Sequence, residues 1–226
     1  MNDVSGEYQP DTVADALHRD LRSRIWEGEF MPGDRVSIRA VAQEHGLSVI
    51  PVRDAVRRLV AEGALRFADS RTIEVPRLSL TNHRDVVFAR MQIEPEAARR
   101  AFEHLTQADL NELVRHDMRV NTAIETDDRR LYMKSNFDFH FLIYRRANAP
   151  TLMRIIEMLW LQSGPSMRYI SSQYGSAAFA IDYHRAATDA LAARDGEGFV
   201  AAIRSDIGQG MEYILRAERE LVERAS

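Results

Sequence analysis

Four side chains in the second half of the sequence are of types that bind metal ions. Asn136 and His140 are four residues apart in the segment NFDFH, so on a helix they would share one face. His184 and Asp206 lie on two later segments that are also predicted to be helical. Imidazole nitrogen and carboxylate oxygen together suit Zn, Ni, Mn or Fe, provided that each histidine is neutral. Spacing alone leaves open the alternative that these residues form a hydrogen-bonded pocket without a metal.

Arginines suited to a different chemistry lie in the segment HGLSVIPVRDAVRRLVAEGAL, residues 45–65. On a helix that begins after Ser48, one face is apolar, and Ile50, Arg53 and Arg57 project to one side of it. The N-terminus of such a helix suits phosphate oxygens. An arginine one turn further in can reach a guanine edge, a contact that contributes about 1–3 kcal/mol. The pattern therefore predicts DNA binding, and the alternative is an ordinary solvated helix face.

The elements around these arginines follow the order of a winged helix-turn-helix. Pro32-Gly33 and Gly46-Leu47 are turn signals. Ser37 and Ser48 can each cap the helix that follows. The expected elements are helices over 10–29, 37–45 and 48–62, then strands over 65–67 and 72–75. The two strands would form a wing with Arg71 at its tip.

From residue 78 onward helical periodicity is continuous and no strand pattern appears. Thr106 is a typical helix start, and Pro150 suits the first turn of a helix. The expected helices span 81–104, 107–125, 128–147, 150–173, 177–194 and 197–224. The predicted fold is mainly α, with a winged helix-turn-helix domain over residues 1–78 and an all-α antiparallel helical bundle over 79–226.

The composition is that of a soluble globular protein. Of 226 residues, 45% are hydrophobic and 28% are charged, which is enough apolar material for a sizeable core. The net charge of −4 means that a DNA-binding surface would have to be local. The sequence has no cysteine, no apolar run of about 18 residues and no signal-peptide pattern. We therefore expect a cytoplasmic protein with no membrane partner.

The first half of the sequence also resembles a known family. The segment FMPGDRVSIRAVAQEHGLSVIPVRDAVRRLVAEGAL is similar to the DNA-binding domain of GntR-family bacterial transcription regulators, through its PG turn and its PVRDA motif at 51–55. It departs at Val49-Ile50, where many relatives have Arg-Thr, and it lacks the usual wing glycine. The resemblance implies that this unit binds double-stranded DNA. The residues expected at the DNA are Arg39, Ser48, Val49, Ile50, Arg53, Arg57 and Arg71.

Residues 81–220 resemble the FCD domain, the C-terminal domain of the FadR-like branch of this family. The matching motifs include Arg90 with Glu94, and Phe139-His140. In metal-binding members, an aspartate four residues before the first histidine, that histidine and two more histidines hold the ion. The resemblance implies a site for one divalent metal ion per chain at Asn136, His140, His184 and Asp206. Asn136 offers a neutral and poorer oxygen ligand, whereas Asp206 restores the negative charge.

The same resemblance implies that the helical domain, identified as FCD-like, binds a small carboxylic acid as its effector. Arg90 is the expected partner, because a guanidinium matches a carboxylate with two hydrogen bonds. Arg168 and Tyr169, in the polar run SMRYISSQYGS, are expected to add to the cavity wall. The alternatives are a surface salt bridge for Arg90 and a frayed helix end for the polar run.

An enzyme is not expected, because the sequence has no GxSxG, HExxH or Walker motif. We predict a homodimeric transcription regulator, with repression favoured over activation. Its operator should be a pseudo-palindrome, because a two-fold dimer requires two-fold DNA. The alternative is a metal- or small-ligand-binding helical protein without DNA-binding activity.

Overall fold

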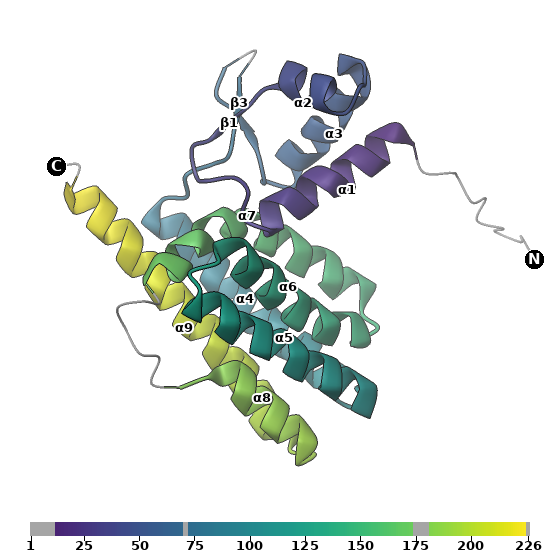
Figure 1. Ribbon diagram of the computed structural model, residues 1–226, viewed down its shortest axis with the longest axis vertical. Helices are drawn as coiled ribbons and strands as arrows, with labels where there is room; N and C mark the ends of the chain where they lie inside the picture. Colours follow the sequence, from purple (N-terminus) through teal and green to yellow (C-terminus); the bar gives the residue numbers. More distant parts are fainter. Residues whose placement is uncertain (1–11, 70–71, 174–180, 225–226) are drawn as a thin grey trace, which may run out of the picture.

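The structure, a computed structural model, describes residues 12–69, 72–173 and 181–224, without the side chains of 168–173 and of most residues after 216. Its elements in chain order are α1 (Val13–Trp26), β1 (Arg35–Val36), α2 (Ile38–Glu44), α3 (Val49–Ala61), β2 (Arg66–Phe67), β3 (Ile73–Glu74), α4 (Leu80–Phe102), α5 (Gln107–Glu125), α6 (Arg129–Arg146), α7 (Pro150–Gln173), α8 (Tyr183–Ala192) and α9 (Gly196–Arg224). The elements from α1 to β3 form the winged unit at the top of Figure 1, and α4 to α9 form the helical bundle below it. This arrangement confirms the predicted fold class.

The helix-turn-helix of the winged unit consists of α2 and α3, which pack against each other and, through α3, against α1. Gly46 lies in the turn between them with φ +64°, a left-handed conformation that glycine adopts without steric cost. α3 buries Val52, Val56 and Leu59 completely. Because these residues recur at helical spacing, the opposite face of α3 is left for solvent or for a ligand.

The wing belongs to a three-stranded antiparallel sheet with the order β1-β3-β2. Glu74 of the central strand is opposite Arg35 on one side and Arg66 on the other. The sequence predicted β2 and β3 but missed β1. A strand of two residues is too short to show alternation, and β1 is a strand only because β3 supplies its hydrogen-bond partners.

In the helical bundle, α4 packs along α9, and α8 lies beside the first half of α9 (Figure 1). Its core includes Phe139, Ile143, Phe199 and Ile203, which have no exposed surface. No helix in the described ranges is long and apolar enough to span a bilayer.

The start of α8 corrects the sequence prediction, which placed a helix from residue 177. Residues 181 and 182 are not helical, and α8 begins after Asp182. The Asp182 carboxylate accepts a hydrogen bond from the backbone N–H of Arg185 at 2.9 Å, which is a typical N-cap. The capping interaction therefore decides where this helix begins.

The winged unit and the helical bundle share part of their cores. Leu161 of α7 is fully buried among the apolar side chains of the winged unit. Trp26, at the end of α1, packs against the apolar clusters of both units, and its ring stacks on that of Phe137 in α6 with centroids 4.7 Å apart. Arg22 of α1 also donates a hydrogen bond to Glu157 of α7 at 3.0 Å.

Candidate nucleic-acid interface and metal centre

A concave surface joins α2, the start of α3 and the wing. Ile50 lies beside Val49 and Arg53 at the start of α3, and it is 71% exposed. The residues lining the concave surface are Ser37, Ile38, Arg39, Val49, Arg53, Arg57, Phe67 and Asp69. The predicted DNA-contacting residues of α2 and α3 thus lie on one face of the winged unit. Arg71 lies outside the described residues.

Ser48 occupies the N-cap position of α3, but its side chain makes no capping hydrogen bond. In α2 the equivalent Ser37 accepts a hydrogen bond from the backbone N–H of Ala40, three residues later. The residue three positions after Ser48 is Pro51, which has no backbone N–H to donate. The sequence prediction that Ser48 caps α3 is therefore wrong for the side chain, and the Ser48 hydroxyl is exposed at the start of the helix.

The arginines of this surface differ in their ion pairing. Arg57 lies 3.8 Å from Asp54, and both side chains are exposed. Arg58 forms an ion pair with Asp15 of α1. Among the described residues, no carboxylate pairs with Arg39 or Arg53. These two guanidinium groups are exposed and have their hydrogen-bond donors available for an anionic ligand.

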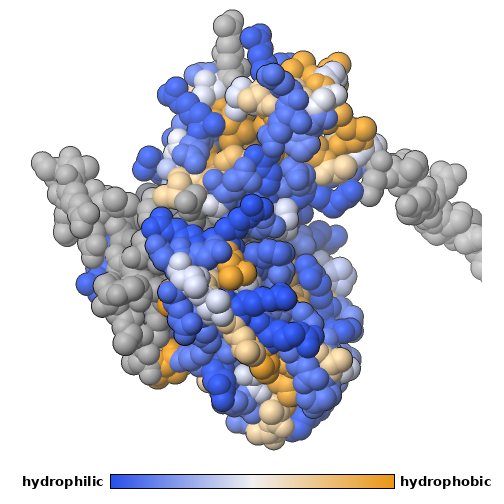
Figure 2. Space-filling model, viewed as in Figure 1, coloured by the Kyte–Doolittle hydropathy of each residue, from blue (hydrophilic) through white to orange (hydrophobic). Residues whose placement is uncertain are grey.

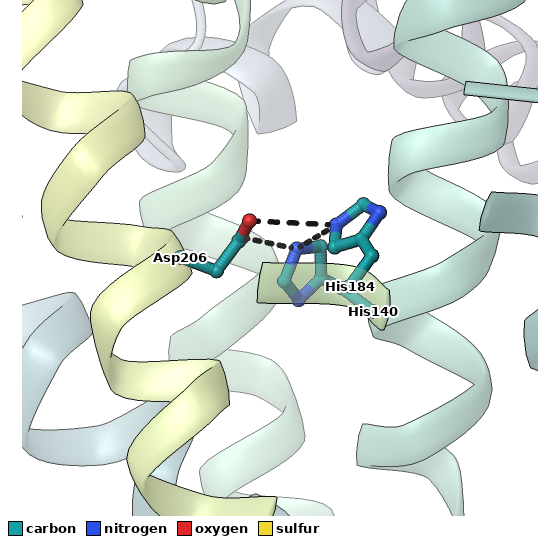
Figure 3. A group of neighbouring side chains, drawn as sticks. All are labelled: His140, His184 and Asp206. Atoms are coloured by element: carbon teal, nitrogen blue, oxygen red, sulfur yellow. Dashed lines mark hydrogen bonds and ion pairs between the residues drawn. The ribbon is translucent and has the colours of Figure 1, made fainter. Parts of the chain in front are cut away.

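A second cluster brings together three donor atoms from three helices of the bundle (Figure 3). His140 is on α6, His184 is at the start of α8, and Asp206 is on α9. The His140 Nε2 atom lies 3.0 Å from Asp206 Oδ2 and 3.4 Å from His184 Nε2, and His184 Nε2 lies 3.6 Å from Asp206 Oδ1. Donors bound at about 2.0 Å around a tetrahedral zinc ion are about 3.3 Å apart, so this spacing fits a metal ion.

Neighbouring hydrogen bonds orient the His140 ring. The Tyr144 hydroxyl lies 2.7 Å from Glu94 Oε2 and 3.1 Å from His140 Nδ1. Burial raises the pKa of Tyr144 well above its ordinary value, so the hydroxyl keeps its single proton. With that proton donated to Glu94, the Tyr144 oxygen accepts a hydrogen bond from His140 Nδ1. This contact at Nδ1 orients the ring so that Nε2, the nitrogen that a metal ion would bind, faces Asp206 and His184.

His184 and Asp206 have the protonation states that a metal ligand needs. Burial lowers the pKa of His184 to about 4, so its imidazole is neutral near pH 7. Its Nδ1 atom lies 3.8 Å from the buried Asp117, which leaves Nε2 facing the cluster. Burial acts to raise the pKa of Asp206, but His184 and His140 outweigh it and hold the pKa of this carboxyl below its ordinary value.

Two small cavities flank this cluster, one beside His140 and one beside His184. Their shared lining residues are Tyr132, Asn136, Asp206 and Gln209. Asn136 is 5% exposed, and it lies next to the cluster because it shares a face of α6 with His140. The structure therefore places all four predicted ligand residues beside two small cavities, of about 20 Å³ next to His140 and about 70 Å³ next to His184.

Arg90 lines the cavity beside His140, but its guanidinium group is already bound. Its Nε and Nη2 atoms donate to the two oxygens of Glu94 at 2.5 and 3.2 Å, and Nη1 donates to Ser163 at 3.3 Å. The group also lies over the ring of Trp160, 4.4 Å from its centroid. Arg90 is 2% exposed, so its salt bridge is buried and not at the surface. The other two predicted effector residues, Arg168 and Tyr169, have side chains outside the described part.

Comparison with known proteins gives two matches to protein-family models. The model of bacterial regulatory proteins of the gntR family matches residues 13–75, and the FCD domain model matches residues 85–209. The chain belongs to the GntR family. It is a transcriptional regulator with an FCD domain.

Individual relatives agree with this assignment. The HTH-type transcriptional regulator McbR of Escherichia coli (strain K12) is 32% identical over 184 residues, which cover 80% of this chain and 83% of McbR. The HTH-type transcriptional repressor RspR of the same organism is 25% identical over 209 residues, covering 92% and 91%. The solved structure of E. coli McbR/YncC superimposes with a TM-score of 0.81 at 28% identity, covering 91% of this chain and 98% of that one. The relatives are regulators, which confirms the prediction that the chain is not an enzyme.

Some residues of this GntR regulator's two sites were not found by sequence reasoning. Tyr144 is one helical turn after His140, so its spacing was a usable signal. Gln209 follows Asp206 by three residues on α9, so its spacing was also a usable signal, whereas Asp117 carried none, because it reaches the cluster from α5. Phe67 was predicted as part of the wing, but its place in the concave surface depends on how the sheet packs on α3.

Proposed function

We propose that the protein is a homodimeric repressor that binds a pseudo-palindromic operator and releases it when a small organic acid binds in the FCD domain. The observation that supports control by a ligand is the convergence of His140, His184 and Asp206 between two cavities. Two relatives are named as repressors: RspR, and the probable D-xylose utilization operon transcriptional repressor of Paenarthrobacter nicotinovorans. Repression is therefore the favoured sign of regulation.

For DNA binding, α3 would enter the major groove from its N-terminus. This end carries the positive end of the helix dipole and the exposed Ser48 hydroxyl, both suited to a backbone phosphate. Arg53 lies one turn further in and has no acidic partner among the described residues, so it can donate to a guanine edge. Arg39 reaches the same surface from α2. A two-fold dimer would present this surface twice, to two half-sites of one operator.

For ligand sensing, His140, His184 and Asp206 would hold one divalent metal ion, with the Asn136 amide oxygen beside them. Three such ligands suit Zn, Ni, Mn or Fe. A bound ion would supply positive charge and an open coordination position for a carboxylate. His140 Nε2 and Asp206 Oδ2 lie 3.0 Å apart, a distance that suits two ligands of one ion and equally a direct hydrogen bond. The donor set therefore fits a metal ion, and a hydrogen-bonded pocket without a metal is the alternative.

The existing contacts of Arg90 limit how many hydrogen bonds it could donate to a carboxylic acid. Because Glu94 already occupies two of its nitrogens, a carboxylate effector would have to compete with Glu94 for Arg90. We therefore assign the main anchoring of the acid to the metal, with Arg90 contributing its charge from the cavity wall. Arg168 and Tyr169 are in the same helix as Ser163 and are proposed to extend the wall.

The control of DNA binding requires that the acid favours one arrangement of the two units over another. His140 and Arg90 both contact the ring of Trp160, which is in the same helix as Leu161. Leu161 is part of the core of the winged unit. A small shift of α7 caused by ligand binding would therefore move the surface on which the winged unit packs.

The test is a comparison of the wild type with His140→Ala, both purified without a His-tag or chelator. We expect about one metal ion per wild-type chain by mass spectrometry, and operator DNA that is released when a di- or tricarboxylic acid such as malate or citrate is added. His140→Ala should lose the metal and the response to acid while keeping its affinity for the operator. His104→Ala, an exposed histidine between α4 and α5, is the control and should behave as the wild type.

A folded His140→Ala protein that cannot bind the operator would contradict this division of labour. A wild-type protein that binds metal but selects no DNA sequence would favour the alternative of a ligand-binding protein without DNA-binding activity. Native mass spectrometry of the same samples tests the dimer.

A further inference from the structure

The start of α3 exposes two aliphatic side chains to solvent. Ile50 is 71% exposed and Val49 is 42% exposed, although both lie in the first turn of a helix whose opposite face is completely buried. Among the described residues of the winged unit, the large apolar side chains that are exposed are Val13, Val49, Ile50 and Phe67. Figure 2 shows apolar areas on this unit among hydrophilic ones, with smaller apolar patches on the helical bundle below. Ile50 and Val49 are adjacent and lie next to Arg53 and Arg57, so an apolar group of a ligand bound by these arginines could bury both side chains.

The charges around Ile50 indicate what kind of ligand this is. Arg53 and Arg57 follow Ile50 by three and seven residues and share its face of the helix. Arg39 stands on the same concave surface. Three exposed cations beside an aliphatic side chain disfavour an apolar protein partner, and they suit the anionic backbone of DNA. Asp54, the one acidic group next to Ile50, lies 3.8 Å from Arg57.

We propose that Ile50, with Val49 beside it, recognises the 5-methyl group of thymine in each operator half-site. This inference rests on the proposed function, because it requires α3 to lie in the major groove. Among the groups that unmodified base pairs display in that groove, the thymine methyl is the apolar one. An aliphatic side chain at the tip of α3 therefore selects a T·A pair by burying that methyl, whereas the pairs without it leave Ile50 against polar atoms.

The geometry of α3 also predicts how far the thymine lies from the guanine that Arg53 contacts. Ile50 and Arg53 are three residues apart, which is about 4.5 Å along a helix axis. Base pairs are spaced by about 3.4 Å. The thymine should therefore lie one or two base pairs from the guanine contacted by Arg53.

The experiment removes only the methyl group. The full-length protein first selects its operator from random DNA, and then each thymine in a half-site is replaced by uracil, which pairs identically but lacks the 5-methyl. At one or two positions of each half-site, we expect the wild type to lose affinity about fourfold, the equivalent of the roughly 0.8 kcal/mol gained by burying one methyl-sized group. Ile50→Ala should bind the thymine and uracil operators equally at those positions, while still preferring guanine at the neighbouring one.

The control is Val114→Ala, which shortens an exposed aliphatic side chain on α5 and should retain the preference for thymine. Tolerance of uracil by the wild type at every position would overturn the inference. Unchanged discrimination by Ile50→Ala and by the double variant with Val49→Ala would also overturn it. A protein that enriches no sequence at all would remove the proposed function together with this inference, so the two failures can be told apart.

Discussion

At the scale of single residues, the charge of the candidate metal centre is set by the choice of its four ligand candidates. Two neutral imidazoles, the Asp206 carboxylate and the Asn136 amide carry one negative charge, so a divalent ion would leave the centre with a net charge of +1. The nearby charges of Arg90 and Glu94 cancel, because the two form a bidentate pair. Burial raises the pKa of Asp117, which lies 3.8 Å from His184, to about 6, so the centre would attract an anionic effector most strongly below that pH, where this carboxyl is neutral. A carboxylate in place of Asn136 would remove this excess charge.

This reasoning predicts opposite effects of Asn136→Asp on the metal and on the acid. Metal affinity should rise about tenfold or more, because the added carboxylate is a charged ligand and about 1.4 kcal/mol suffices for that factor. The affinity for a carboxylic acid should fall. Competition with a chelator measures the first quantity, and calorimetry with malate or citrate measures the second. Asn111→Asp makes the same charge change on the exposed face of α5 and should leave both affinities unchanged.

Arg53→Ala tests the other site at this scale. We expect operator binding to weaken by about 1–3 kcal/mol and sequence preference to relax at one base pair, because a guanine contact is lost. Arg58→Ala is the control on the same helix, since Arg58 pairs with Asp15 of α1. A titration that is identical for Arg53→Ala and the wild type would remove Arg53 from the interface.

Residue types and helical spacing were sufficient to predict Asn136 and His140 as neighbours, because the two share one helix. The prediction that His184 and Asp206 join them came from a resemblance to the family, since no local pattern links segments on separate helices. The pairing of Arg90 with Glu94 could also have been predicted, because these residues are four apart on α4. Which partner Arg90 takes depends on the packing of α4 against α7, and the sequence alone does not determine that.

At the scale of elements, two of the helices begin with the same N-terminal capping motif. α1 and α5 each start with a capping box, in which a threonine and the aspartate three residues later exchange hydrogen bonds. Each of these aspartates also binds an arginine from another helix, Arg58 for Asp15 and Arg146 for Asp109. One carboxylate thus fixes both where the helix starts and where it lies against its neighbour.

Asp109→Ala should therefore destabilise the bundle. We expect the free energy of unfolding to fall by about 1–2 kcal/mol, because a cap and an ion pair are lost together and Arg146 is half exposed. Burial acts to raise the pKa of Asp109, but hydrogen bonds from Thr106 and Arg146 outweigh it and lower the pKa below its ordinary 3.8.

The sign of the pH dependence follows from that lowered pKa. A carboxyl with a lower pKa in the folded state contributes its full stability above the unfolded value, and this contribution is lost as pH falls through the folded value. The difference between wild type and Asp109→Ala should be constant near pH 7 and should shrink below about pH 4. Urea unfolding of the wild type and of Asp109→Ala, near pH 7 and again below about pH 4, measures this difference in stability. Asp189→Ala, an exposed partner of Arg185 on α8, should show almost no change at either pH.

Helices could be predicted closely because their signals are local: the predicted 107–125 and 150–173 agree with α5 and α7. β1 could not be predicted, because it is a strand only through its hydrogen bonds with β3. The N-cap of α3 could be placed at Ser48, but the absent capping bond follows from Pro51, a local effect that capping preferences do not include.

At the scale of the whole molecule, four rings connect the metal centre to α1. We call Trp26, Phe137, Phe141 and Trp160 the aromatic cluster. Phe137 stacks on Trp26 and on Phe141, with centroids 4.7 and 3.9 Å apart, and Trp160 meets the edge of both phenylalanines. His140 lies 5.4 Å from Trp160, so the cluster touches the centre at one end and the winged unit at the other.

Trp26→Ala should uncouple the two ends of this cluster. We expect the metal content to stay near one ion per chain, while the change in operator affinity caused by a carboxylic acid becomes smaller. Stability should fall by about 2–3 kcal/mol, less than for a fully buried tryptophan, because Trp26 is half-buried. Operator titrations with and without acid measure the coupling. Trp26→Phe keeps a ring in place and should retain most of it. An undiminished acid response in Trp26→Ala would place the coupling elsewhere.

Leu161 has a consequence for how such regulators can exchange parts during evolution. The sequence suggests a module that ends near residue 78, yet the core of that module includes a leucine supplied by α7, far along the chain. A recombination event that joins a foreign winged unit at this boundary would leave Leu161 facing side chains that never adapted to it. New combinations of a winged unit with an FCD domain should therefore fold mainly when the two parent proteins have similar α7 sequences. The evolution of the DNA-binding domain is thus coupled to one helix of the FCD domain.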